Sequence, residues 1–220
     1  MFWFTADLHL GMPYTVTRRR PFVTPEDADK TMLKNIKSVV AEDDVLLVIG
    51  DLFDYSDSNK ETWSQMGAKV KRLKRNIKLL LGNNEERIIK EQFGGSRANF
   101  KYYCENFNIE LIDYQTTVKI GKLPFLCVHK PENANKSILN LYGHVHNAGQ
   151  IGALGLNVAQ DINGFFPVSE AEIARRIYVV ANHYDKSIKE STNIKDLSLF
   201  RKYYHDTKHL LQEVNHEQLQ

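Results

Sequence analysis

Short apolar runs that end at a glycine recur along the first half of the chain. Residues 45–49 form a wholly apolar run, and residues 77–81 form a second run interrupted only by Lys78; polar side chains follow the glycine after each run. Runs that are apolar at every position predict strands buried on both faces of a sheet. Before the first of these runs, apolar residues repeat at helical spacing over 25–40, after a threonine that suits an N-cap and a proline that suits the first helical turn. The pattern therefore predicts an α/β fold in which helices cover a sheet.

The hydrophobic pattern changes after about residue 109. Short alternating runs replace the long helical ones, and a tight Gly121-Lys122 turn joins two of them, which predicts a meander of strands. A capping box at 169–172 then opens another helix. The strands predicted in this half span residues 109–112, 115–120, 123–129, 137–142 and 156–159.

Side chains that can bind metal ions follow five of the predicted strands. A single Asp-x-His or His-x-His pair is weak evidence, because a lone histidine more often has a structural role. Here four of the eight histidines stand in such motifs. In an extended chain alternate side chains point the same way, so Asp7 and His9 are expected to reach one ion. Nitrogen and oxygen donors suit divalent first-row metals. The donors are Asp7, His9, Asp51, Asp54, Asn83, His129, His144 and His146.

Composition narrows the protein class only a little. With 220 residues and 42% hydrophobic content, the chain is expected to form one sizeable core, and a formal net charge of +2 does not require nucleic acid or an acidic membrane as partner. The N-terminal sequence has no signal peptide or membrane-spanning run, which predicts a cytoplasmic protein. Cys104 and Cys127 show no metal-ligand spacing and are interpreted as buried thiols.

The C-terminal part from residue 183 is polar and predicted to be mostly helical. We expect a domain over 1–182 and a helical extension over 183–220 that packs on this domain or on a second subunit. His205 and His209 have a spacing that can bind zinc, but no glutamate motif accompanies them. The oligomeric state does not follow from the sequence.

The order D-x-H, G-D-x-x-D, G-N-x-E, H and G-H-x-H resembles the calcineurin-like metallophosphoesterase superfamily over residues 5–146. Residues 157–169 resemble a tail segment of its small, single-domain microbial and phage members. The resemblance implies a four-layer αββα sandwich of two mixed β-sheets flanked by helices. It also implies two divalent metal ions, for which we expect manganese, with iron, zinc or nickel as alternatives.

The resemblance also assigns roles to the donor residues. Asp7, His9 and His146 would hold one ion, and Asn83, His129 and His144 would hold the other. Asp51 would bridge the two ions, and Asp54 would support the ligands from behind. Asp51, Asp54 and Asn84 are the predicted catalytic residues.

The activity implied is hydrolysis of a phosphate ester by in-line attack of a metal-bridging hydroxide. A small phosphodiester or nucleotide is the expected substrate, and Arg19, Arg20 and Lys130 are the predicted phosphate-binding cations, with Arg18 beside them. Four aromatic residues are candidates to stack on a base, although core packing is the more usual role and the one expected for each of them. These aromatic residues are Tyr14, Phe22, Phe165 and Phe166.

One position departs from the superfamily pattern. Asn84 stands where most relatives carry a histidine that protonates the leaving group, and an amide cannot supply a proton. The enzyme is therefore expected to prefer good leaving groups or to use another acid, such as His183. Two alternatives remain open: a DNA nuclease of the double-strand-break repair type, and a catalytically weakened binding module. A protein Ser/Thr phosphatase is disfavoured, because Tyr55-Ser56 stands where those enzymes carry an arginine.

Overall fold

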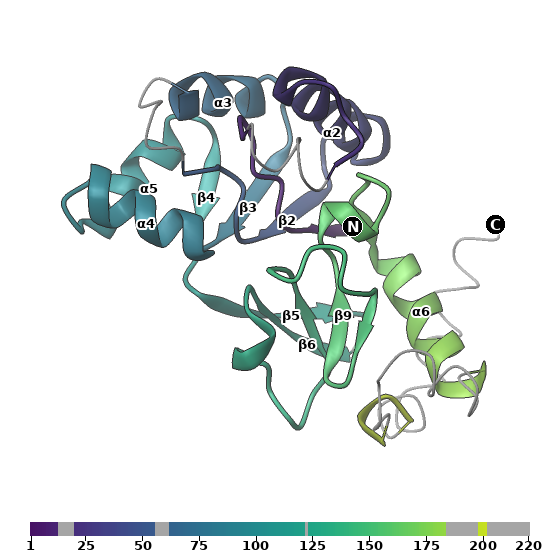
Figure 1. The fold of residues 1–220 in the computed structure, drawn as a ribbon. Helices are drawn as coiled ribbons and strands as arrows, with labels where there is room; N and C mark the ends of the chain where they lie inside the picture. Colours follow the sequence, from purple (N-terminus) through teal and green to yellow (C-terminus); the bar gives the residue numbers. More distant parts are fainter. Residues whose placement is uncertain (13–19, 56–61, 122, 184–197, 202–220) are drawn as a thin grey trace.

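The computed structural model describes residues 1–12, 20–55, 62–121, 123–183 and 198–201, and these form two five-stranded sheets flanked by helices (Figure 1). The strands are β1 (Phe2–Thr5), β2 (Val45–Ile49), β3 (Asn76–Leu80), β4 (Ile109–Leu111), β5 (Gln115–Ile120), β6 (Leu123–Val128), β7 (Asn140–Tyr142), β8 (Ile151–Gly152), β9 (Gly155–Asn157) and β10 (Val168–Ser169). The α-helices are α2 (Pro25–Val39), α3 (Thr62–Lys71), α4 (Asn83–Gln92), α5 (Arg97–Glu105) and α6 (Glu170–His183), and the short 3₁₀ helices are η1 (Pro131–Asn133) and η2 (Gln160–Ile162).

Both sheets contain parallel and antiparallel pairs. The first has the order β10-β1-β2-β3-β4, in which β1 to β4 run parallel and β10 pairs antiparallel with β1. The second has the order β5-β6-β7-β9-β8, with parallel pairs in its centre and antiparallel pairs at its edges. The predicted fold class, two mixed sheets flanked by helices, is confirmed.

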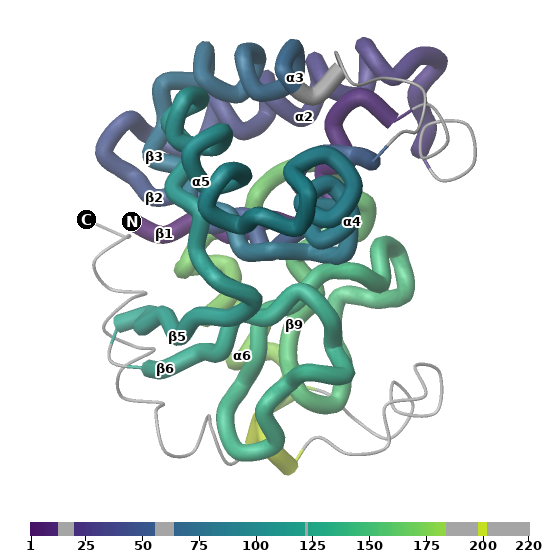
Figure 2. The backbone as a smooth tube through the Cα atoms, turned by 90° about the vertical axis from the view of Figure 1, so that its left-hand side faces the viewer, coloured from purple at the N-terminus to yellow at the C-terminus, as the bar shows by residue number. Residues whose placement is uncertain are grey.

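Strand β2 is buried on both faces, as its apolar run predicted. Leu46 and Val48 face the helices, whereas Leu47 and Ile49 face the second sheet. Figure 2 shows α2 and α3 on one side of the first sheet and β5, β6 and β9 on the other. The carboxyl ends of β1, β2 and β3 therefore open into loops held between two packed layers.

Helix α2 begins as its sequence predicted, because the Thr24 side chain accepts a hydrogen bond from the backbone N–H of Asp27 at 3.1 Å. The strand predicted over 137–142 is shorter and begins at Asn140. The side-chain amide of Asn140 donates to the carbonyl oxygens of Asn135 and Ile138, and its oxygen accepts from the N–H of Asn135. These bonds hold the preceding residues in a turn, so the chain is not free to pair there.

Helix α6 packs its apolar stripe into the core between the sheets. Ile173, Ile177 and Val180 are fully buried in this core, and so is Phe200 from the described part of the C-terminal extension. The rest of the predicted extension, with His205 and His209, lies outside the described residues. None of the described helices is long and apolar enough to span a membrane.

We expect the buried aromatic residue Phe100 on α5 to contribute strongly to the stability of the fold. Phe100 is fully buried, with its ring 5.4 Å from that of Phe93 between centroids, so Phe100→Ala should lower the free energy of unfolding by about 3–5 kcal/mol in urea denaturation. Tyr102, on the same helix but 69% exposed, is the matched control, and Tyr102→Ala should change stability by no more than about 0.5 kcal/mol. Equal losses in the two variants would contradict this placement of α5.

Candidate metal centre

Most of the predicted metal ligands lie in backbone turns with left-handed conformation. This conformation is uncommon outside glycine and costs roughly 1–2 kcal/mol per residue, so it persists where the surroundings enforce it. Asp7 and His9 were expected to reach one ion because an extended chain points alternate side chains the same way. This reason was wrong, because the chain is not extended at either residue. The left-handed ligands are Asp7 (φ 56°), His9 (φ 46°), Asp51 (φ 54°), His144 (φ 70°) and His146 (φ 47°).

The first two ligand turns lie side by side. The backbone N–H of Asp7 donates to the carbonyl of Gly50 at 3.2 Å, and that of His9 donates to the carbonyl of Asp51 at 3.0 Å. These bonds continue the pairing of β1 with β2 beyond the regular strands. They place the side chains after β1 next to the carboxylate after β2.

Two glycines let the ligand carboxylates approach the backbone. A Cβ atom on Gly82 would lie 2.2 Å from Asp51 Oδ1, and one on Gly143 would lie 2.7 Å from Asp7 Oδ2. Any side chain at either position would therefore displace a carboxylate. This explains physically why a glycine precedes Asn83 and His144.

The carboxylate of Glu85 joins the turns that follow β2 and β3. It is fully buried and accepts hydrogen bonds from the backbone N–H groups of Asp51 (2.8 Å), Leu52 (3.0 Å) and Gly82 (2.9 Å). Burial, with the negative charge of Asp51 second, raises the pKa of Glu85 to about 7, although the backbone hydrogen bonds oppose this shift. Sequence reasoning placed Glu85 in a motif but gave it no role.

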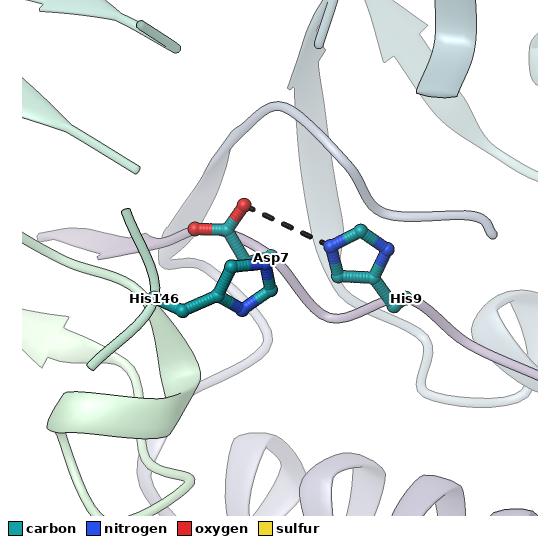
Figure 3. Close-up of side chains that lie close together, drawn as sticks. All are labelled: Asp7, His9 and His146. Carbon is teal, nitrogen blue, oxygen red and sulfur yellow. Dashed lines mark ion pairs between the residues drawn. The ribbon is translucent and has the colours of Figure 1, made fainter. Parts of the chain in front are cut away.

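One group of donors comprises Asp7, His9 and His146, whose ligand atoms lie within 4.8 Å of one another. In Figure 3 Asp7 and His9 come from the same segment, and His146 comes from the loop that crosses it. Asp7 Oδ1 lies 3.9 Å from His9 Nε2, and both atoms are buried without a hydrogen-bond partner among the described residues. Buried polar atoms are normally paired, so these two orphaned atoms fit a cation between them.

A second group of donors comprises Asn83, His129 and His144. Asn83 Oδ1 lies 3.0 Å from His129 Nε2 and 2.9 Å from His144 Nδ1. Asp51 Oδ2 lies 3.5 Å from His129 Nε2 and 3.6 Å from His9 Nε2, so this carboxylate stands between the two groups. Donor atoms at such separations suit ions with ligand bonds of roughly 2 Å.

Three of the histidines are oriented by an acceptor behind the ring. Nδ1 of His9 lies 3.1 Å from Asp54 Oδ1, Nδ1 of His129 lies 2.8 Å from a backbone carbonyl, and Nδ1 of His146 lies 2.9 Å from Asp161 Oδ2. Because carbonyl and carboxylate oxygens accept, Nδ1 carries a proton in each ring, which leaves Nε2 as the nitrogen that would bind a metal. Nε2 of His129 faces Asp51 Oδ2 and Asn83 Oδ1, so this ring would give up its second proton when a metal binds. Asp54 thus contacts His9, one of the predicted ligands, from the side opposite Nε2.

The electrostatics of the centre favour an ionised Asp51. Burial opposes ionisation, but the hydrogen bond and charge of His129, with the charge of His9, hold the pKa of Asp51 well below its ordinary value. Burial likewise opposes protonation of His129, yet Asp51 raises its pKa to about 9. Burial raises the pKa of Asp7, and the nearby histidines only partly offset this. The cluster therefore holds buried carboxylates, Asp7 and Asp51, whose negative charge a nearby cation would stabilise.

Asn84 contacts the Asp51 carboxylate directly. Its backbone N–H donates to Asp51 Oδ1 at 2.9 Å, and its side-chain amide donates to Oδ2 at 2.7 Å. Its side-chain oxygen accepts the backbone N–H of Tyr55 at 3.1 Å. Asn84 is thus positioned to orient Asp51, a role that the sequence alone did not indicate.

Arg20 does not have the predicted phosphate-binding position. Its side chain is 1% exposed, and its guanidinium donates to the Asp161 carboxylate and to the carbonyls of Asp7 and Leu8. The prediction failed because it assumed that the Arg20 side chain is exposed to solvent and has no partner within the protein. Arg18, Arg19 and Tyr14 lie outside the described residues.

Lys130, the other predicted phosphate-binding cation, lines a cleft beside the second donor group. The cleft has a volume of about 70 Å³. The candidate acid His183 lies instead at the exposed end of α6, with its ring against Tyr178. Polar and aromatic residues that line the cleft are Asn83, Glu86, Tyr114, His129, Lys130 and Asn133.

The aromatic residues considered for base stacking are partly accounted for by packing. Phe22 and Phe165 pack edge to face at 4.8 Å between ring centroids, and both lie against the helix-side core. Phe166 is 42% exposed. Core packing is therefore the role that the structure supports for Phe22 and Phe165.

Comparison with solved structures finds a similar fold in a protein of unknown function, AQ665 from Aquifex aeolicus. That structure is 20% identical, with a TM-score of 0.55, and the match covers 80% of this chain and 98% of that one. The nuclease MPE of Pseudomonas putida (20% identity, TM-score 0.44, 66% of this chain and 61% of that one) and the phosphoesterase Yfce of E. coli (17% identity, TM-score 0.43, 72% and 77%) also match. Among curated proteins no match is found.

Residues 1–219 match the calcineurin-like phosphoesterase family. This match includes every donor described above, from Asp7 to His146. The chain belongs to the calcineurin-like phosphoesterase family.

Proposed function

We propose that this chain is a binuclear metal-dependent phosphoesterase that hydrolyses a small phosphodiester or a nucleotide. The observation that carries the proposal is the position of Asp51 Oδ2, within 3.6 Å of His9 in one donor group and within 3.5 Å of His129 in the other. A carboxylate between two donor groups suits two ions that share it. Manganese is the ion chosen for the tests, with iron, zinc and nickel as alternatives, because all four accept a mixture of imidazole, carboxylate and amide donors.

Each described group has a definite task in this proposal. Two divalent ions, when bound, would supply an activated water and neutralise charge on the phosphoryl oxygens. Glu85 fixes the Asp51 turn, Asn84 orients the Asp51 carboxylate, and Asp54 fixes the ring of His9. The side chains thus preorganise the centre, which avoids a reorganisation cost during the reaction.

The cleft beside Asn83 and His129 is the proposed place for the substrate. Lys130 would bind a phosphate oxygen there as a point charge, and Tyr114 and Asn133 would contact the ester group. Because Lys130 is the one lysine or arginine in the described lining and the cleft is small, a small phosphate ester fits better than a nucleic acid. The presence of all seven predicted donors argues against a binding module that has lost its metals.

Asp51→Asn should remove most of the hydrolysis of bis-p-nitrophenyl phosphate and p-nitrophenyl phosphate by the manganese-loaded protein. An amide is a poor bridging ligand, and we expect a loss of about 100-fold or more, the scale of removing one charge-stabilising group. Asp43→Asn, which alters an exposed carboxylate in the turn before β2, is the control and should keep the wild-type rate. Activity that survives in Asp51→Asn would refute the shared-ligand role.

Replacing Lys130 by methionine should raise KM about 5–10-fold with little change in kcat, because a charge on the non-reacting phosphate oxygens stabilises bound substrate and transition state alike. The exposed Lys136 lies six residues along the same connection and provides the control, Lys136→Met. Steady-state kinetics on both p-nitrophenyl esters measures the effect. A KM equal to that of wild type would place the phosphate elsewhere.

Asn84→His should improve cleavage of poor leaving groups relative to good ones. A general acid contributes about 10²–10⁴ in rate where the leaving group needs a proton, so the ratio of kcat/KM for methyl phenyl phosphate to that for methyl p-nitrophenyl phosphate should rise at least tenfold. Asn84→Gln keeps an amide and should not raise this ratio. If the ratio in Asn84→His stays unchanged or falls, a side chain at position 84 is not placed to protonate the leaving group.

A further inference from the structure

Asp161, in η2, has a buried carboxylate shared by two partners. Its Oδ2 atom lies 2.9 Å from His146 Nδ1, and its Oδ1 atom accepts from Arg20 Nε at 2.9 Å. A second guanidinium nitrogen of Arg20 lies 3.2 Å from Oδ2. The side chains of Asp161 and Arg20 are only 3% and 1% exposed, so solvent barely competes for these contacts.

Arg20 extends this network to the first ligand turn. Its Nη1 donates to the carbonyl of Leu8 at 2.7 Å, and its Nη2 donates to the carbonyl of Asp7. A continuous series of hydrogen bonds therefore runs from the Asp7 backbone through Arg20 and Asp161 to the His146 ring. It connects two segments that are more than 130 residues apart in sequence and that both supply ligands to the first donor group.

The charge of the pair suits this arrangement. The guanidinium of Arg20 is always protonated, and its Nε lies 2.9 Å from Asp161 Oδ1 in a buried ion pair, so the Asp161 carboxylate is ionised. An ionised carboxylate accepts only, so it fixes the proton of His146 on Nδ1 and leaves the Nε2 lone pair for a ligand bond.

We infer that Arg20 and Asp161 form a positioning pair that holds His146 as an Nε2 ligand of the first metal and fixes it relative to Asp7. The inference rests on the proposed function, because it assigns these two residues to the same metal centre. Neither residue contacts substrate in this scheme. Their effect is exerted through the His146 ring and the Asp7–Leu8 backbone.

A purely structural ion pair is the competing explanation, since buried ion pairs are weak evidence for any particular role. It predicts that removing any other contact that anchors the η2 segment weakens metal binding as much as removing the Asp161 carboxylate does. Arg176 allows this comparison, because its Nη1 donates to Asn163 Oδ1 at 2.8 Å and so anchors the same segment from α6. In the described structure Arg176 bonds to Asn163 and Glu172, neither of which is a proposed ligand.

The test measures binding of Mn²⁺ to metal-free wild type, Asp161→Asn and Arg176→Met by titration calorimetry, with thermal unfolding of each metal-free protein. Wild type should bind two ions. Asp161→Asn should lower the affinity for one of the two ions about 10–100-fold, which is the usual effect of removing the hydrogen-bond partner of a ligand histidine. Arg176→Met should bind both ions as wild type does, even where its melting temperature falls.

A second readout is independent of metal. In metal-free wild type, two-bond ¹H–¹⁵N spectra of the neutral His146 ring should show the proton on Nδ1, and Asp161→Asn should shift the population towards the Nε2–H form. A wild-type ring protonated on Nε2 would overturn the inference. Equal Mn²⁺ affinity in wild type and Asp161→Asn, or equal weakening in Arg176→Met, would also overturn it.

Arg20→Lys decides the matter if Asp161→Asn does not fold. It keeps the positive charge but lacks the planar fork that spans Asp161 and the two carbonyls, so Mn²⁺ affinity should fall at one site. Unchanged affinity at both sites would overturn the inference. Failure of wild type to bind Mn²⁺ would overturn the proposed function as well, whereas wild-type binding with unaltered variants would overturn the positioning pair alone.

Discussion

The hydrogen bonds that the buried Glu85 carboxylate accepts determine where the metal centre can form. The turn after β2 leaves the sheet inside the protein, where its backbone N–H groups have no neighbouring strand to pair with. Glu85 satisfies those of Asp51 and Leu52 and also that of Gly82 before α4. The two turns are thereby fixed to each other, and the Asp51 carboxylate between the donor groups takes its position from this contact.

Left-handed backbone at the ligand residues is stored strain that the packing around it must offset. Asp7, Asp51 and His146 share this conformation with two other ligands. It turns each side chain out of the line of its strand and towards a common point. Regular strands would send successive side chains to opposite faces, so a centre with this many donors requires such turns.

The fold and the gathering of the candidate donors could largely be predicted from sequence, because aliphatic runs reveal strands locally and the donor motifs follow them directly. The contact between Arg20 and Asp161 could not be predicted. Their contact joins residues 141 positions apart, and no local periodicity encodes it. The role of Asn84 was also hidden, because its residue type shows the loss of an acid but not the hydrogen bonds to Asp51.

The pairing of β1 with β10 has a consequence for biosynthesis. Trp3 and Phe4 pair with Ser169 and Val168, and Ala6 forms a bridge with Ala159 just beyond the strand. Strand β1 therefore has an unpaired edge until β10, more than 160 residues further along the chain, has been made. Such an edge invites pairing with other chains, so the nascent protein passes through an aggregation-prone stage that ends only when β10 docks.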